Sequence, residues 1–346
     1  GGYNMAMMGA LLMTAGAGGI NGSYAIPTKY IKRWSFESTW LVFSLMTFFL
    51  GPWLFLYGFS DNGWLSLVHL WSVVSFSHLS QLFAGGVLFG CGQIGFAWAL
   101  KRIGMGLAFV INIGLSVVLG SFLPIFLHHS RLLWLPVGFT LLGVVIILLG
   151  LGVSYRAGKL RKGRDGAVMD NRKVYFYGVL SAVVAGLGSA GQNFTFALNH
   201  DALMGYAQLV GFSSLAAKTA VWPFFLTFSF IPYALYMLYL NIKNKSFHEY
   251  VTAEKRYYFY SILMMLGWYG SLILYSYAVM EVGQLGAVVI WPLFMSLIIL
   301  TSNFWGWCFG EWKHASLQTK RMAVCGLLCF ILSLPCFAYA TYCVSI

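Results

Sequence analysis

The longest polar stretch of the chain is RAGKLRKGRDGAVMDNRK, residues 156–173, and seven of these residues are lysine or arginine. Long apolar runs precede and follow it. We interpret the stretch as a basic cytoplasmic linker between two halves, residues 1–155 and residues 174–346. Because one membrane span takes about 20 apolar residues, each half has room for five spans.

The composition indicates a membrane protein. The chain has 346 residues, of which 60% are hydrophobic and 9% are charged, whereas about 25% of the residues of a soluble domain are charged. It contains 39 glycines, and small residues of this kind let membrane helices approach one another closely. These values predict an all-α, multi-pass protein whose main partner is the lipid bilayer.

Apolar runs of spanning length predict ten transmembrane helices. The seventh run is too long for one straight span and contains Pro223 and Pro232, so we expect a kink there or an extension beyond the membrane. A shorter run with helical spacing, from Trp64 to Val74, predicts a helix lying on the outer membrane surface, or else an ordinary long loop. The predicted spans cover residues 5–28, 38–58, 79–101, 105–127, 132–155, 174–198, 207–240, 257–280, 283–308 and 321–344.

The basic residues gather in alternate connections between these spans. Of the 21 lysines and arginines, 19 fall in the odd-numbered connections. Basic loops stay on the cytoplasmic side of a membrane, so both termini are expected outside. The net charge of +12 therefore describes orientation in the membrane rather than affinity for nucleic acid.

Lys218 and Arg131 are the two basic residues outside those connections. Lys218 falls inside the seventh predicted span, where an ammonium group must reach water, pair with an anion or lose its proton. It is therefore a candidate for proton coupling or for binding an anionic substrate. The alternative is that its long side chain extends to the outer interface.

Small residues recur between the two halves, which indicates an internal repeat. Because five helices per half is an odd number, the second copy must be inserted upside down, an arrangement typical of secondary transporters. The sequence thus predicts two inverted repeats of five helices. The recurring sets are Gly9, Gly19 and Gly22 with Gly178, Gly188 and Gly191, and Ala99, Gly104 and Ala108 with Ala278, Gly283 and Ala287.

Several uncharged polar and aromatic residues lie within the predicted spans. Amides both donate and accept hydrogen bonds, and indole and phenol faces pack on C–H groups, so together they suit a neutral polyhydroxylated ligand such as a sugar. The alternative for each one is a hydrogen bond to a neighbouring helix. The candidate cavity residues are Tyr24, Gln93, Asn112, Gln192, Asn193 and Trp291, with Trp98, Trp268 and Tyr269 as stacking surfaces.

Signatures of other functions are missing from the sequence. It has no GxxxxGK[ST] run for ATP, no HExxH or GxSxG motif, and no pair of carboxylates inside a predicted span. None of the six cysteines forms a CxxC pair. We therefore expect neither an enzyme nor a bound cofactor or metal.

Short motifs recur in order along nearly the whole chain. They are residues 27–29 and 34–40, Gly90, Gly92, Ile94, Gly104, Met105, Arg156, Ala157, Gly158, Leu160, Trp291, Ser296, Glu311 and Trp312. In these motifs the chain resembles the bacterial L-rhamnose-proton symporter family of the drug/metabolite transporter superfamily. The resemblance implies uptake of a sugar with a proton across the inner membrane, through a central cavity that opens to alternate sides. One departure concerns residues 286–291, GAVVIW, where the family pattern can carry an aspartate before the tryptophan and this chain has none.

The missing carboxylate leaves the energy source open. Proton symport of L-rhamnose or a related monosaccharide is the leading hypothesis. A facilitator, a carrier of another sugar or polyol, or an exporter of a small metabolite or drug also fits the residues, as does a receptor that keeps the fold. The sequence predicts no oligomeric state.

Overall fold

The computed structural model describes residues 2–127, 134–162 and 171–345, and these residues form helices and connections without a strand. Residues 163–170 of the predicted linker and Arg131 lie outside this part of the chain. The helices are α1 (Gly2–Asn21), η1 (Ile26–Tyr30), α2 (Phe36–Ser44), η2 (Leu45–Leu50), α3 (Gly51–Gly58), α4 (Trp64–Val73), α5 (Phe76–Phe122), η3 (Leu123–Leu127), α6 (Trp134–Lys162), α7 (Arg172–Val210), α8 (Ser214–Ala217), α9 (Val221–Asn244), α10 (Glu249–Thr252), α11 (Arg256–Val282), α12 (Gly286–Cys308) and α13 (Leu317–Ser345).

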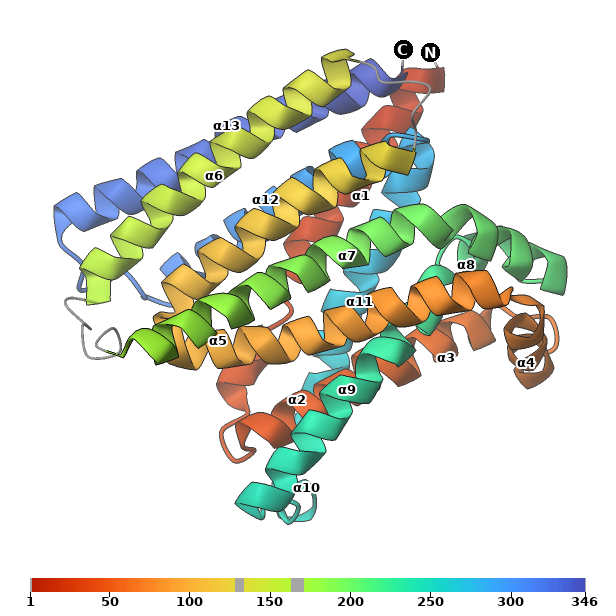
Figure 1. Ribbon diagram of the computed structural model, residues 1–346, viewed down its shortest axis with the longest axis horizontal. Coiled ribbons are helices and arrows are strands. Elements are labelled where there is room, and N and C mark those ends of the chain that lie inside the picture. The colour runs from red at the N-terminus through yellow and green to blue at the C-terminus, as the bar shows by residue number, and fades with distance from the viewer. Residues whose placement is uncertain (1, 128–133, 163–170, 346) are drawn as a thin grey trace. The chain divides into compact units, whose positions relative to one another are not determined.

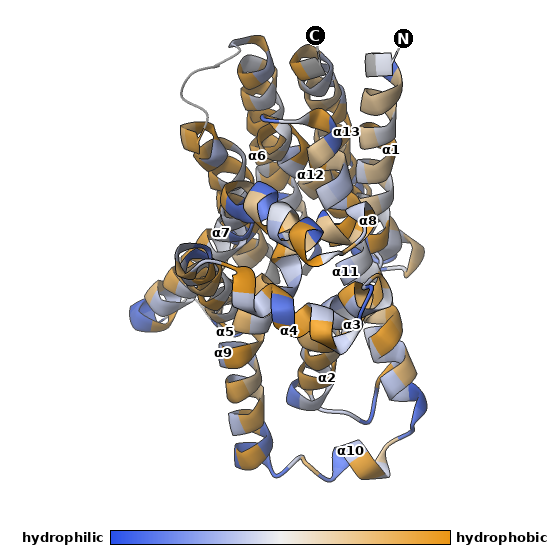
Figure 2. Cartoon of the chain, turned by 90° about the vertical axis from the view of Figure 1, so that its right-hand side faces the viewer, coloured by the Kyte–Doolittle hydropathy of each residue, from blue (hydrophilic) through white to orange (hydrophobic). Residues whose placement is uncertain are grey.

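Nine helical segments in the described residues are long and apolar enough to cross a membrane. Apolar residues predominate along these helices, and hydrophilic residues gather at connections such as those beside α10 (Figure 2). The first predicted span is a helix, α1, but its glycines and asparagines make it less apolar, and it is not among the nine. The structure therefore confirms an all-α membrane protein.

The third and fourth predicted spans correspond to the apolar segments Phe76–Ile103 and Leu107–Leu127, which one continuous helix, α5, contains. Two other predicted boundaries were wrong. The sixth span extends to Val210, because α7 continues past the predicted end at residue 198. The seventh begins at Val221 instead of residue 207, and the short helix α8 separates it from α7.

The predicted second span contains a π-helix, η2, between α2 and α3. Pro52 follows this segment and has no N–H with which to bond the carbonyl of Phe48. The Gly51 N–H instead reaches back five residues to the Met46 carbonyl. A proline in a spanning helix is tolerated because such a local change of register re-satisfies the backbone. The predicted short helix is also present, as α4.

The chain divides into two compact units, and each unit combines segments from both halves of the sequence. Unit 1 comprises residues 1–23, 92–194 and 277–346. Within it, α6 and α13 lie side by side (Figure 1). Gly143 meets Phe337, Gly150 meets Cys329 and Ser154 meets Gly326, so the two helices run antiparallel.

Unit 2 comprises residues 24–91 and 195–276. In this unit the helices of the second predicted span, α2 and α3, pack antiparallel to α9. The Ser38 hydroxyl accepts a bond from the Asn241 side-chain amide at 3.3 Å, and at the other end Trp53 Nε1 donates to Thr227 Oγ1 at 2.7 Å. Gly86 and Gly90 of α5 allow α9 to approach, since a Cβ at either position would meet its backbone.

The contact between α6 and α13 should be sensitive to a single methyl group. A Cβ at Gly150 would lie 2.9 Å from Cys329 Cβ, whereas one at Gly152 meets nothing within 4 Å. We predict that Gly150→Ala lowers the free energy of unfolding by about 1–3 kcal/mol through overpacking, measured as the thermal midpoint in detergent. Gly152→Ala is the matched control, because it makes the same change in helix propensity without the clash. Equal midpoints for the two variants would contradict this packing.

Candidate functional site

Three helices of unit 1 bring together a set of polar groups spaced four residues apart. Helix α5 contributes Asn112, Ser116 and Gly120, α7 contributes Ser189 and Asn193, and α12 contributes Ala287 and Trp291. Residues four apart lie on one face of a helix. Each helix therefore presents a short polar stripe, and the hydrogen bonds below show that the stripes meet.

Asn193 is the residue that joins all three helices. Its side chain is fully buried, and its Nδ2 donates to the Gly120 carbonyl at 2.7 Å and to the Ala287 carbonyl at 2.9 Å. A side-chain amide has two N–H donors, so these two bonds use both of them. Asn193 is in the predicted cavity set, but its amide nitrogen positions backbone instead of pointing to a ligand.

Trp291 lies at the same contact between helices, next to Gly120. Its indole Nε1 donates to the Ser116 carbonyl at 3.0 Å, and 1% of the residue is exposed. The ring lies over Gly120, where a Cβ would overlap Nε1. Gly120 is therefore required for two contacts, one with Asn193 and one with the indole.

Asn112 and Gln192 differ from Asn193 in their hydrogen bonding. Asn112 is 8% exposed, and its Oδ1 accepts from the Ser189 hydroxyl at 3.4 Å. Gln192 is 5% exposed. In the described part of the chain, neither the Asn112 amide nitrogen nor the Gln192 side chain has a hydrogen-bond partner. Buried amides usually find a partner, so these groups are free to bind a ligand.

The other two candidates in unit 1 lie apart from this cluster. Gln93 is half-buried on α5, with no side-chain hydrogen bond to described residues. Trp98 is 41% exposed, and the Arg102 guanidinium lies 5.4 Å from its ring centre. The ring is thus on a surface, beside a cation, and the structure does not join it to the amides.

Unit 2 contains a continuous aromatic cluster around Phe48 of the π-helix. Tyr24 stacks on Phe43, with 5.5 Å between ring centres, and Phe43 contacts Phe48 at 6.0 Å. Trp268 lies 5.4 Å from Phe48. Two predicted residues, Tyr24 and Trp268, therefore belong to one cluster. The ring of Tyr269 contacts Phe55 at 6.5 Å.

The sequence predicts Lys218 inside a spanning helix, but the structure places it outside one. It follows α8 as its C-cap, in the turn before α9 begins at Val221, and its side chain is partly exposed. The apolar run misled the prediction because α8 and this turn are nearly as apolar as the helix that follows. Lys218 therefore lies in a turn between two helices and not within the spanning helix α9.

The structure also contains a buried polar network in unit 2 that the sequence did not predict. Asn241 is fully buried, and its amide nitrogen donates to Ser38 Oγ at 3.3 Å and to Ser246 Oγ at 2.8 Å. Both hydroxyls then donate to carboxylates, Ser246 to Glu37 at 2.8 Å and Ser38 to Glu249 at 2.6 Å. The network joins the start of α2 to the end of α9.

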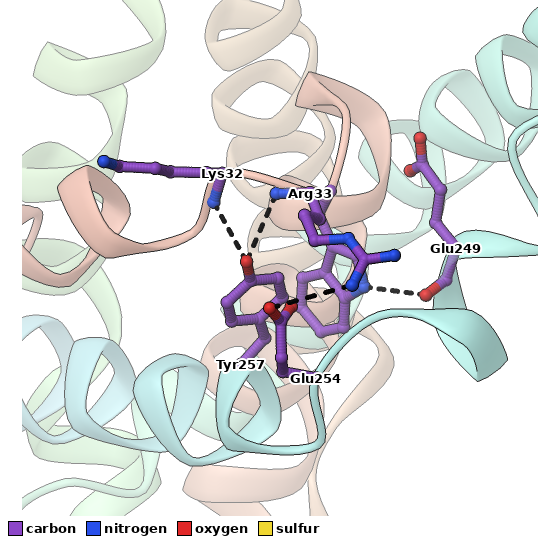
Figure 3. Close-up of polar contacts among 6 residues, drawn as sticks. Lys32, Arg33, Glu249, Glu254 and Tyr257 are labelled. Atoms are coloured by element: carbon purple, nitrogen blue, oxygen red, sulfur yellow. Dashed lines mark hydrogen bonds and ion pairs between the residues drawn. The ribbon is translucent and has the colours of Figure 1, made fainter.

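The adjoining loop is fixed by Tyr257, which is 1% exposed (Figure 3). Its hydroxyl accepts the backbone N–H groups of Lys32 and Arg33, each at 3.3 Å. The Glu254 carboxylate beside this hydroxyl pairs with the Arg33 guanidinium at 3.8 Å. These contacts join residues more than 200 positions apart, so no local spacing in the sequence reveals them.

Comparisons with known proteins place the chain in a family. The model of the L-rhamnose-proton symport protein family matches residues 3–339. An L-rhamnose-proton symporter of Citrobacter koseri is 27% identical over 95% of this chain and 96% of its own length. The symporters of Escherichia coli and Shigella dysenteriae are each 26% identical, with the same coverage.

The apolar helices and the buried polar stripes define a multi-pass membrane transporter. The chain belongs to the L-rhamnose-proton symport protein family. This is a family of transporters and not of enzymes, in agreement with the expectation from the sequence. The described residues contain no group of three or more metal-binding side chains.

The Tyr257 hydroxyl should influence both stability and its pH dependence. The hydrogen bonds to the backbone N–H of Glu254 and from Tyr257 lower the pKa of the Glu254 carboxyl below its ordinary value of 4.5. A lowered pKa contributes stability above the ordinary pKa, and this contribution is lost as the pH falls through the folded-state pKa. We predict that Tyr257→Phe costs about 1–2 kcal/mol at pH 7 and flattens the decline of the thermal midpoint below pH 5.

The control for this prediction is Tyr260→Phe, since no hydrogen bond involves the Tyr260 hydroxyl within the described residues. It should leave both the midpoint and its pH profile close to those of the unmodified protein. A pH profile of Tyr257→Phe that parallels the unmodified one would contradict the influence of the Tyr257 hydroxyl on the pKa of Glu254.

Proposed function

We propose that this protein imports L-rhamnose or a related monosaccharide together with a proton, by alternating access through ten helices in two inverted repeats. The family and the names of its relatives support the substrate class and the proton coupling. The inner membrane is the proposed location, with both termini outside, because 19 of the 21 basic residues fall in connections that this orientation places in the cytoplasm.

Contacts between equivalent positions support the inverted repeat. Residues related by a two-fold repeat touch their own counterparts only near the symmetry axis. Phe89 and Trp268 lie at the same offset as Ala99 and Ala278, and their ring centres are 6.2 Å apart. Two further pairs at this offset are in contact, Ser116 with Met295 and Gly150 with Cys329. Three predicted helix pairs therefore meet at equivalent residues, each pair within one unit.

Helix α1 is the proposed tenth span. It has 20 residues, which corresponds to about 30 Å of helix, the thickness of the hydrocarbon core. It packs on α12, where Gly18 and Gly22 admit Leu297 and Thr301. In unit 1 the start of α1 and the end of α13 lie close together (Figure 1). An even number of spans puts both termini on one side of the membrane in this way.

The amides of Asn112 and Gln192 carry the proposed sugar site. They are buried and have donors or acceptors without a protein partner in the described residues, on the helices α5 and α7 that Asn193 joins. Hydroxyl groups of a sugar would supply the missing partners. Gln93 joins them as a further half-buried amide, and the exposed ring of Trp98 is proposed only as a secondary stacking surface. In unit 2, Tyr24, Trp268 and Tyr269 are the proposed aromatic surfaces.

Direct uptake tests the function. In proteoliposomes whose medium is more acidic than their interior, labelled L-rhamnose should accumulate inside above equilibrium. A protonophore should abolish the accumulation. Equilibration that ignores the gradient would indicate a facilitator instead. Absence of rhamnose flux, with flux of another metabolite, would indicate a carrier for a different substrate.

The two kinds of amide should respond differently to truncation. We predict that Asn112→Ala and Gln192→Ala each weaken L-rhamnose binding about tenfold, which is about 1.4 kcal/mol, with little change in the thermal midpoint. Asn193→Ala should instead lower the midpoint, because it leaves the Gly120 and Ala287 carbonyls without their donor. Binding titrations and thermal unfolding in detergent measure both effects. A large loss of stability in all three variants, without a specific loss of binding, would contradict the assignment.

Lys218 is the proposed proton-coupling residue, positioned in the turn before α9. We predict that Lys218→Met abolishes accumulation driven by a pH gradient while rhamnose exchange at equal pH persists, because exchange needs no net proton movement. Lys245→Met is a matched control, since that lysine is an exposed C-cap of α9. Gradient-driven accumulation in Lys218→Met equal to that of the control would remove Lys218 from the coupling mechanism.

A further inference from the structure

Thr47, in the middle of the π-helix, has an unsatisfied hydroxyl. The residue is fully buried, and its Oγ1 has no hydrogen-bond partner in the part of the chain that the structure describes. A buried polar group left without a partner costs about 1–3 kcal/mol. Such a group is expected to have a compensating purpose, because replacing it by a methyl group removes the cost.

Other threonines in the spanning helices show how this cost is normally avoided. A helical threonine can donate its hydroxyl to the carbonyl four residues earlier. Thr140 and Thr341 do so at 2.7 and 2.8 Å, as does Thr227 at 2.6 Å. Thr140 and Thr47 are equally buried, at 0% exposure. Unlike these three hydroxyls, that of Thr47 has no hydrogen-bond partner among the described residues, a condition that it shares with the buried hydroxyl of Ser121.

The π-helix is the physical reason for the difference between Thr47 and these threonines. The change from bonds four residues apart to bonds five residues apart shifts the carbonyls relative to the side chains, so the Phe43 carbonyl does not receive the Thr47 hydroxyl. Pro52, whose nitrogen cannot donate within the helix, directly follows Gly51, the residue whose N–H makes the five-residue bond. π-segments of this kind occur frequently at functional sites.

The surroundings of Thr47 are suited to the apolar part of a sugar. Thr47 is one residue from Phe48 and four residues from Phe43, and both rings belong to the aromatic cluster of unit 2. Tyr233 and Trp268 contact Phe48 at 5.7 and 5.4 Å. A hydroxyl on a helical segment that also carries rings of this cluster matches a monosaccharide, which presents hydroxyls on its rim and C–H groups on its faces.

We propose that the Thr47 hydroxyl binds a hydroxyl of the transported monosaccharide, with the rings around Phe48 as the apolar wall of the same subsite. The inference rests on the proposed function, since it needs a sugar as the ligand. It adds a binding residue that is neither a candidate amide nor part of a sequence motif. The π-helix keeps the hydroxyl from bonding to its own backbone, and the ligand then satisfies it.

The test compares two threonine-to-valine substitutions of equal shape. Thr47→Val should weaken L-rhamnose binding about fivefold, the loss of one hydrogen bond, while the thermal midpoint of the sugar-free protein stays the same or rises. Thr140→Val is the control. It removes a hydroxyl that bonds the Pro136 carbonyl, so its midpoint should fall while its affinity for L-rhamnose stays unchanged. Thr47→Ser should restore binding, because it keeps the hydroxyl.

The possible results separate this proposal from the function on which it rests. If the unmodified protein binds L-rhamnose and Thr47→Val binds it equally well, the subsite is wrong and the function stands. A fall in midpoint for Thr47→Val as large as that for Thr140→Val would also overturn it, because the hydroxyl would then hold the helix together. If the unmodified protein binds no L-rhamnose in isothermal titration, the function fails, and the subsite fails with it.

Discussion

The structure depends on one constraint, which is that a polar group inside a bilayer has no water with which to bond. Helices satisfy the backbone, so each polar side chain must find its own partner. Most do so within a turn or on the next helix, as Trp222 does with Ser276 at 2.6 Å and Ser296 does with Ser333 at 2.8 Å. Before Pro52 the backbone meets the same constraint by a change of register, since the Gly51 N–H bonds the Met46 carbonyl in a π-segment.

The same constraint separates polar residues that hold helices together from those available to a ligand. Asn193 and Asn241 use both amide hydrogens within the protein, so they position helices and loops. Asn112, Gln192 and Thr47 are buried to a similar degree but keep donors or acceptors without a partner among the described residues. A transporter needs buried groups without a protein partner. Its substrate leaves its hydrating water behind and must form hydrogen bonds with the protein instead.

The helices and the basic connections could be predicted from the sequence because they depend on composition and on charge within short windows. The predictions were wrong where apolar residues continue through a break, as between Val210 and Val221, since hydropathy does not mark a turn made of Ser, Leu and Ala. The sequence also could not show that Asn193 is fully hydrogen-bonded while Asn112 is not, because the bonds of Asn193 go to carbonyls of other helices. Pro52 was the one local signal for the π-segment. The network around Tyr257 had none, since its partners lie near residue 32.

The central claim is that sugar and proton cross the membrane together through this arrangement of buried groups. The most direct measurement records the external pH of a weakly buffered suspension of de-energised vesicles containing the protein when L-rhamnose is added. The account predicts that the medium becomes alkaline as sugar enters, that the change saturates with sugar concentration, and that a protonophore abolishes it. Entry of L-rhamnose at the same rate with no change in external pH would contradict the claim.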